Sequence, residues 1–163
     1  MALCCSMVLN DVIHTIISAD LGFLSTALKW SCGQVNACYG DNGDLLHSDV
    51  LKNISRNLGP TMARYGITPY LSACFGAPQV MANLSCDPQS PVAQKWWKDK
   101  ADEIWHLWPT FGGFLVKADS EGNIGPLTFN RTEADGANLL ARAVAPHSGI
   151  VMWRAFVYGN QDW

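Results

Sequence analysis

Residues 112–122 of the chain read Gly-Gly-Phe-Leu-Val-Lys-Ala-Asp-Ser-Glu-Gly, an apolar run that ends in one lysine and two carboxylates before a glycine. A second run, residues 149–158, reads Gly-Ile-Val-Met-Trp-Arg-Ala-Phe-Val-Tyr and sets one arginine into an otherwise apolar segment. A charged side chain is costly to bury unless a partner or a ligand compensates it. The two runs therefore predict two strands that bring charge to the edge of a functional site.

Short apolar runs alternate with amphipathic stretches beyond Trp30, which is typical of βα units and a parallel sheet. We expect four strands, near Gly33–Cys38, Thr68–Phe75, Gly113–Asp119 and Gly149–Val157. Their spacing leaves room for a crossover helix and loops between consecutive strands.

The first expected helix runs from a Ser48 cap to about Tyr65, with apolar residues at three- and four-residue steps and a stop at Gly66. Gly59-Pro60 interrupts this pattern, and a proline at that position bends a helix or divides it in two.

The second expected helix opens at Ser90-Pro91 and ends before Pro109. It carries several of the chain's seven tryptophans, which predicts an aromatic side packed inward, with a sugar-stacking surface as the alternative. The third opens at Thr132, where Asp135 completes a capping box, and runs to Pro146.

Consecutive parallel strands with crossover helices form either an open doubly wound sheet or a section of a (β/α)₈ barrel. No glycine-rich nucleotide-binding motif follows any expected strand, which weakens the first alternative. A whole barrel needs about 250 residues. The expected fold is therefore α/β, a partial (β/α)₈ TIM barrel of about four parallel βα units over residues 31–163, preceded by a segment, residues 1–30, to which no fold is assigned.

The composition is that of a globular protein, with 163 residues, 48% hydrophobic and 15% charged. The net charge of −3 and the absence of a Lys/Arg cluster with interleaved aromatics argue against a nucleic-acid partner. Residues 1–30 lack a basic n-region and carry Asp11 and Asp20, so neither a signal peptide nor a membrane span is expected. Three N-x-S/T sequons, at Asn53, Asn83 and Asn130, suggest an extracellular location if the source is eukaryotic.

Common catalytic and metal-binding motifs are absent from the sequence. The six cysteines include no C-x-x-C pair, so buried thiols and disulfides both remain open. The four histidines are isolated, and no G-x-S-x-G motif or Cys-His nucleophile setting occurs. No metal and no cofactor are expected.

Strand alternation groups Leu115, Lys117 and Asp119 on one face, and likewise Ile150, Met152, Arg154 and Phe156. One interpretation is a buried salt bridge from Lys117 or Arg154 to Asp119. The other is that the two cations hold a ligand carboxylate, a task that suits the planar fork of arginine, with Glu121 nearby as an acid in the loop beyond the strand.

At these residues the chain resembles glycoside hydrolase family 67, the α-glucuronidases that act on xylan-derived oligosaccharides. The resemblance covers roughly residues 33–163 and is carried most specifically by Lys117-Ala118-Asp119-Ser120-Glu121 and Trp153-Arg154-Ala155-Phe156 at the family's separation. Further matching blocks are Val35-Asn36-Ala37, Arg64-Tyr65-Gly66-Ile67, Tyr70-Leu71-Ser72, the segment from Asp87-Pro88 to Trp96-Trp97, Gly112 to Pro126, Arg131-Thr132 with Asp135-Gly136-Ala137-Asn138, and Gly149 to Tyr158.

The resemblance implies a (β/α)₈ catalytic domain and inverting hydrolysis that releases glucuronic acid, or its 4-O-methyl ether, from xylo-oligosaccharides. Glu121 stands where the family has its general acid, and Lys117 and Arg154 stand where it binds the uronate carboxylate. A homodimer of the longer parent protein is a further expectation.

The chain departs from the family at Cys74, in place of a usual asparagine, at Glu133, in place of a usual histidine, and at the Gly59-Pro60 helix break. The family's base carboxylates lie on later strands, so we expect this chain to be a fragment that is inactive by itself. The alternative is a non-catalytic chain that binds uronic-acid sugars.

Overall fold

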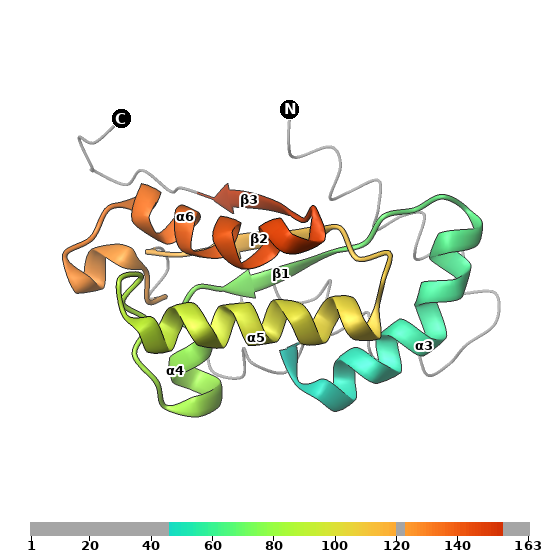
Figure 1. The fold of residues 1–163 in the computed structure, drawn as a ribbon, viewed down its shortest axis with the longest axis horizontal. Coiled ribbons are helices and arrows are strands. Elements are labelled where there is room, and N and C mark those ends of the chain that lie inside the picture. Colours follow the sequence, from blue (N-terminus) through green and yellow to red (C-terminus); the bar gives the residue numbers. More distant parts are fainter. Residues whose placement is uncertain (1–45, 120–122, 155–163) are drawn as a thin grey trace. The chain divides into compact units, whose positions relative to one another are not determined.

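The computed structural model describes residues 46–119 and 123–154 (Figure 1), which belong to one compact unit of the chain, Asp41–Trp163. Its elements are, in order, α3 (Ser48–Arg64), β1 (Tyr70–Cys74), α4 (Ala77–Ala82), α5 (Pro91–Leu107), β2 (Gly113–Lys117), the 3₁₀ turn η2 (Pro126–Phe129), α6 (Glu133–Val144), the 3₁₀ turn η3 (Ala145–His147) and β3 (Ile150–Arg154). The expected strand at Gly33–Cys38 and the boundary between residues 30 and 31 lie outside the described residues.

The three strands form one parallel sheet in the order β1-β2-β3. Helices α4 and α5 connect β1 to β2, and α6 connects β2 to β3, so the expected alternation of strand and crossover helix is confirmed in this part of the chain. A small parallel sheet with helical crossovers is an α/β arrangement.

The core lies between the sheet and the helices α5 and α6, which cover the same face of it (Figure 1). Phe114, in the central strand, is fully buried and packs edge-to-face against Trp97, with ring centroids 5.9 Å apart, and against Phe111 at 5.3 Å. Trp105 and Trp108 are also buried. The prediction that helix α5 packs its aromatic side inward is therefore confirmed. Burial of these rings is the main contribution to stability of the core between the sheet and the helices.

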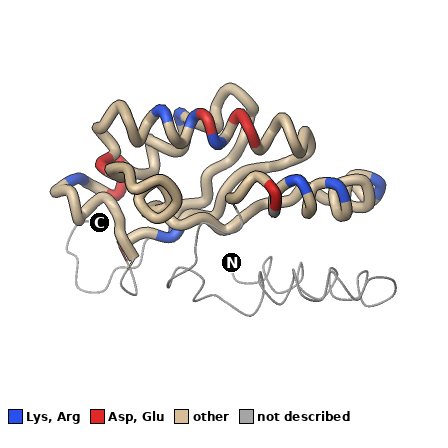
Figure 2. Tube along the Cα trace, turned by 90° about the horizontal axis from the view of Figure 1, so that it is seen from below, with Lys and Arg blue, Asp and Glu red and all other residues tan. Residues whose placement is uncertain are grey.

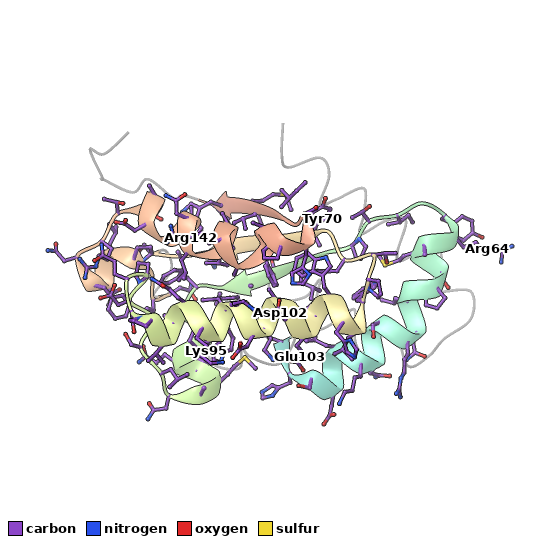
Figure 3. The ribbon with its side chains drawn as sticks, viewed as in Figure 1. Arg64, Tyr70, Lys95, Asp102, Glu103 and Arg142 are labelled. Atoms are coloured by element: carbon purple, nitrogen blue, oxygen red, sulfur yellow. The ribbon has the colours of Figure 1, made fainter. Side chains whose placement is uncertain are left out.

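Helix α3 begins where expected, but Ser48 is not its cap. The N-cap residue is His47, which makes no capping bond, and the Ser48 hydroxyl instead donates to Glu103 of α5. Figure 3 shows Glu103 on the side of α5 that faces α3. The hydroxyl therefore joins two helices, a tertiary role that capping rules do not predict.

Pro60 lies inside α3, and the helix continues through it instead of dividing. The axis of α3 changes direction along its length (Figure 1), as expected for a helix that loses one backbone hydrogen bond at a proline. The stop at Gly66 is confirmed: its φ is +66°, and the amides of Gly66 and Ile67 donate to the carbonyls of Ala63 and Met62 at 3.1 and 2.8 Å. These two bonds form a Schellman motif.

The boundaries of α5 and α6 follow the sequence signals. Pro91 is the first residue of α5, and α6 opens with the predicted capping box, in which the Asp135 amide donates to Thr132 Oγ1 at 3.1 Å and the Thr132 amide donates to Asp135 Oδ2 at 2.9 Å. Along α5 basic and acidic positions are interspersed, whereas in α3 one acidic residue is followed by basic residues only (Figure 2). Pairs such as Lys98 with Asp102, at 2.6 Å, are exposed ion pairs. No helix of the described ranges is long and apolar enough to span a membrane.

The face of the sheet that points away from α5 and α6 carries several exposed side chains. Ile150 and Met152 are 54% and 39% exposed, and Ser72 is exposed in β1, whereas Ala73 and Val116, whose side chains point to the helices, are buried. Parallel sheets are normally covered on both faces. On the face away from α5 and α6 the described residues range from exposed, at Ser72, Ile150 and Met152, to buried, at Cys74 and Lys117.

Candidate active site

The carboxyl ends of β2 and β3 bring the two predicted cations together. The strands pair in parallel, with Lys117 directly opposite Arg154 and Cys74 of β1 opposite Lys117. Adjacent strands lie about 4.8 Å apart, so both side chains leave the same face of the sheet from neighbouring positions. The prediction that Lys117 and Arg154 lie side by side on neighbouring strands is confirmed.

Burial differs between the two cations. Lys117 is only 6% exposed, whereas Arg154 is half-buried. The Lys117 carbonyl accepts from the Phe75 amide at 3.0 Å, which continues the β1–β2 ladder one residue beyond the last strand position of β1. An ammonium and a guanidinium at neighbouring strand ends are the kinds of donor that bind an anionic group.

Asp119 does not lie on the predicted face of the strand. Strand β2 ends at Lys117, and Asp119 adopts a left-handed conformation with φ of +45°, so the two-residue alternation does not reach it. Its Oδ2 accepts from the Leu127 amide at 3.0 Å. Among the described residues Asp119 forms no ion pair with Lys117 or Arg154, so the alternative of a buried salt bridge to Asp119 is not observed.

This aspartate instead closes the loop that follows β2. The bond from Leu127 to Asp119 joins the two ends of residues 119–127, and a side chain at Gly125 would collide with the Asp119 carboxylate. Burial raises the pKa of Asp119, against the lowering effect of the Leu127 amide. Glu121 belongs to this loop and lies outside the described residues, so its role stays a prediction.

A second carboxylate, Glu133, lies close to Asp119 at the start of α6. Its Oε2 accepts from Trp153 Nε1 at 2.7 Å. Burial raises the pKa of Glu133, and the charge of Asp119 raises it further, against the lowering effect of the indole hydrogen bond. Two carboxylates therefore lie near each other at the same end of the sheet as the two cations.

Sequence reasoning missed the bond between Glu133 and Trp153. The sequence marks Glu133 only as a departure from a family pattern, and Trp153 only as part of an apolar run and of a block that resembles the family. The two residues lie in different elements, and no local spacing rule joins a residue in the first turn of a helix to one in the strand that follows it.

Metal chemistry finds no support in this region. Across residues 46–119 and 123–154, no three His, Cys, Asp or Glu side chains are grouped so that they could hold an ion. Of the cysteines described, Cys86 is a buried free thiol and Cys74 is disulfide-bonded. Its Sγ lies 3.7 Å from Asn123 Oδ1, at the end of β1.

Parallel strands with cations at their carboxyl ends define an α/β protein whose charged groups converge where α/β enzymes carry their sites. Residues 26–163 match the glycosyl hydrolase family 67 middle domain, and the chain belongs to this family.

Three relatives show how far the similarity extends. The chain is 46% identical to the alpha-glucuronidase of Hypocrea jecorina over 126 residues, which is 75% of this chain and 15% of that protein. It is 43% identical to alpha-glucuronidase A of Emericella nidulans over 122 residues and to probable alpha-glucuronidase A of Neosartorya fischeri over 120 residues. The matched region spans about 14–15% of the length of these relatives.

Proposed function

We propose that this chain supplies the acid side of an α-glucuronidase site, which releases glucuronic acid or its 4-O-methyl ether from xylo-oligosaccharides with inversion. The observation that carries the proposal is the register of the sheet, which places Lys117 opposite Arg154 at the carboxyl ends of adjacent strands. Membership of family 67 and the names of the relatives support the same activity.

In the proposed mechanism each charged residue has one task. The Arg154 guanidinium binds the uronate carboxylate through two parallel hydrogen bonds, and the Lys117 ammonium adds a point charge beside it. Glu121 gives its proton to the glycosidic oxygen as the bond from that oxygen to C1 of the uronic acid breaks. Water adds to C1 from the opposite side and gives its proton to a base carboxylate, with the two carboxyl groups roughly 6.5–9.5 Å apart.

The proposal assigns the base to another part of the enzyme, because the chain spans only about 15% of the relatives it matches. The three parallel strands then belong to a (β/α)₈ barrel, with the exposed face of the sheet directed to the barrel interior. We expect the 163-residue chain by itself to release no glucuronic acid from aldouronic acids. Release by the purified chain would contradict this division of tasks.

An extracellular location is part of the proposal. The sequon asparagines Asn53, Asn83 and Asn130 are all exposed, so a glycan at each would meet solvent. The disulfide at Cys74 also fits an oxidising compartment.

The test uses a chimera, in which the aligned segment of the Hypocrea jecorina relative is replaced by this chain. We expect the chimera to release glucuronic acid from aldouronic acids. Glu121→Gln should lower kcat by about a thousandfold or more, because the leaving oxygen loses its proton donor. Arg154→Met should instead raise KM strongly, since it removes a bidentate bond to the substrate.

Glu103→Gln is the matched control, because Glu103 lies on α5 and bonds to Ser48 and Lys100, away from the strand ends. The control should keep the kinetic constants of the chimera. If the chimera releases glucuronic acid but Glu121→Gln shows the same kcat and KM as Glu103→Gln, the role of Glu121 as the acid is overturned.

A further inference from the structure

Arg154 lies at the end of β3, whose only strand neighbour in the described part of the chain is β2. Whatever fixes β3 on its helix side contributes to the direction in which the Arg154 side chain leaves the strand.

The residue that fixes β3 on that side is Trp153. Consecutive strand residues point to opposite faces, so Trp153 points toward the helices while Arg154 points to the other face. The indole packs edge-to-face on Phe75, with ring centroids 5.9 Å apart. It also lies against Gly136 of α6, where an added Cβ would come within 2.7 Å of Trp153 Cη2.

The indole is held by a polar bond as well as by packing. Glu133 is the first residue of α6, and its carboxylate accepts from Trp153 Nε1 at 2.7 Å, the length of a strong hydrogen bond to a charged acceptor. The capping box of Thr132 and Asp135 fixes the first turn of α6, so Glu133 is presented from a rigid support. Rotation of β3 about its axis would break this bond.

We propose that Glu133 is a positioning residue that fixes the direction of Arg154 at the strand edge through its bond to the indole of Trp153. The inference rests on the proposed function for its consequence, the binding of a uronate carboxylate. The link from Glu133 through Trp153 to Arg154 is a property of the chain with or without a ligand.

The first experiment needs no ligand. In a ¹H–¹⁵N spectrum of the 163-residue chain, the Nε–H resonance of Arg154 is identified by its loss in Arg154→Lys. We expect Glu133→Ala to shift or broaden this resonance, and Glu133→Gln, which keeps an acceptor for the indole, to leave it close to its original position. Arg142, on the exposed side of α6 (Figure 3), is the internal control and should not move.

Trp153→Phe keeps an aromatic ring in the core but removes the donor together with the part of the indole that lies against Gly136, so it tests the same bond if Glu133→Ala fails to fold. It should displace the Arg154 resonance in the same way. An Arg154 resonance that does not move in whichever of these variants folds would overturn the proposal.

The second experiment measures kinetics in the chimera. Glu133→Ala should raise KM for an aldouronic acid by about tenfold, the equivalent of one ordinary hydrogen bond, with a smaller change in kcat. Trp153→Phe should cost less in the Glu133→Ala background than with Glu133 intact, because the bond between the two side chains is lost only once. An unchanged KM in Glu133→Ala would also overturn the proposal. A double variant whose loss equals the sum of the losses of the two single variants would overturn it as well. A chimera that is inactive before mutation would instead count against the proposed function, and the Arg154 resonance would still decide the role of Glu133.

Discussion

At the scale of single residues, three carboxyl groups of the described part of the chain differ in their pH behaviour. Burial raises the pKa values of Asp119 and Glu133. Burial also acts on Glu103, but hydrogen bonds from Lys100 and Ser48 outweigh it and lower the pKa of Glu103. A raised carboxyl pKa means that the folded state binds the proton more tightly than the unfolded state, and a lowered pKa means the reverse.

Glu133→Gln should therefore become more stable relative to the unmodified chain as pH rises. The contribution of a group with a raised pKa is fully present below its unfolded value of about 4 and is lost as pH rises through the folded value. Glu103→Gln should show the opposite trend, because the Glu103 carboxylate stabilises the fold above about pH 4 and loses this effect as pH falls. Urea unfolding of both variants at several pH values between 4 and 7 measures the two slopes. Slopes of the same sign would contradict this assignment.

At the scale of elements, two glycines explain how helices end and how they approach the sheet. Gly66 ends α3 with a left-handed backbone and has no atom within 4 Å of an added Cβ, so its constraint is conformational. Gly136 lies inside α6 with Pro126 and Trp153 closely packed against it, so its constraint is steric. Glycine is therefore required at position 66 by the backbone conformation and at position 136 by the close packing.

Gly136→Ala should destabilise the fold by about 1–3 kcal/mol, the usual cost of overpacking. A loss of stability in Gly136→Ala would be informative, because alanine is favoured over glycine by about 1 kcal/mol in an unobstructed helix interior. Gly66→Ala should cost about 1 kcal/mol through backbone strain alone. Thermal or urea unfolding measures both, and only Gly136→Ala should also shift the indole resonance of Trp153. A stabilised Gly136→Ala variant would contradict the close packing of α6 on Trp153.

At the scale of the whole molecule, the two faces of the sheet differ in what covers them. Helices α5 and α6 bury one face, while Ile150 and Met152 on the other remain substantially exposed. Val80 of α4 and Val92 of α5 are exposed to a similar extent, at 53% and 49%. In the proposed barrel, the sheet face that carries Ile150 and Met152 points inward, and the helices that carry Val80 and Val92 lie outside. Substitutions of the first pair should therefore reduce the stability of a complete enzyme more than substitutions of the second pair.

The double variant Ile150→Thr, Met152→Thr should change the stability of the 163-residue chain little, because exposed side chains contribute little burial. In the chimera the same change should cost about 2 kcal/mol or more, since two apolar side chains would leave a core. Val80→Gln with Val92→Gln is the matched control and should be tolerated in both proteins. Equal losses for the two pairs in the chimera would argue against a barrel.

The sequence by itself determined the local structure of this protein. The alternation of strand and helix, the Schellman stop at Gly66, the capping box at Thr132 and the inward tryptophans of α5 follow from contacts within a few residues, which local patterns encode. The placement of Lys117 beside Arg154 was also predictable, because each cation ends an apolar run and parallel strands meet at one edge.

Only the tertiary structure decided the rest of the site. The bond from Ser48 to Glu103 and the bond from Glu133 to Trp153 join different elements, and the left-handed turn at Asp119 with its bond to Leu127 depends on the conformation of a whole loop. Such contacts depend on strand register and on how a helix is placed over the sheet, which no local periodicity specifies.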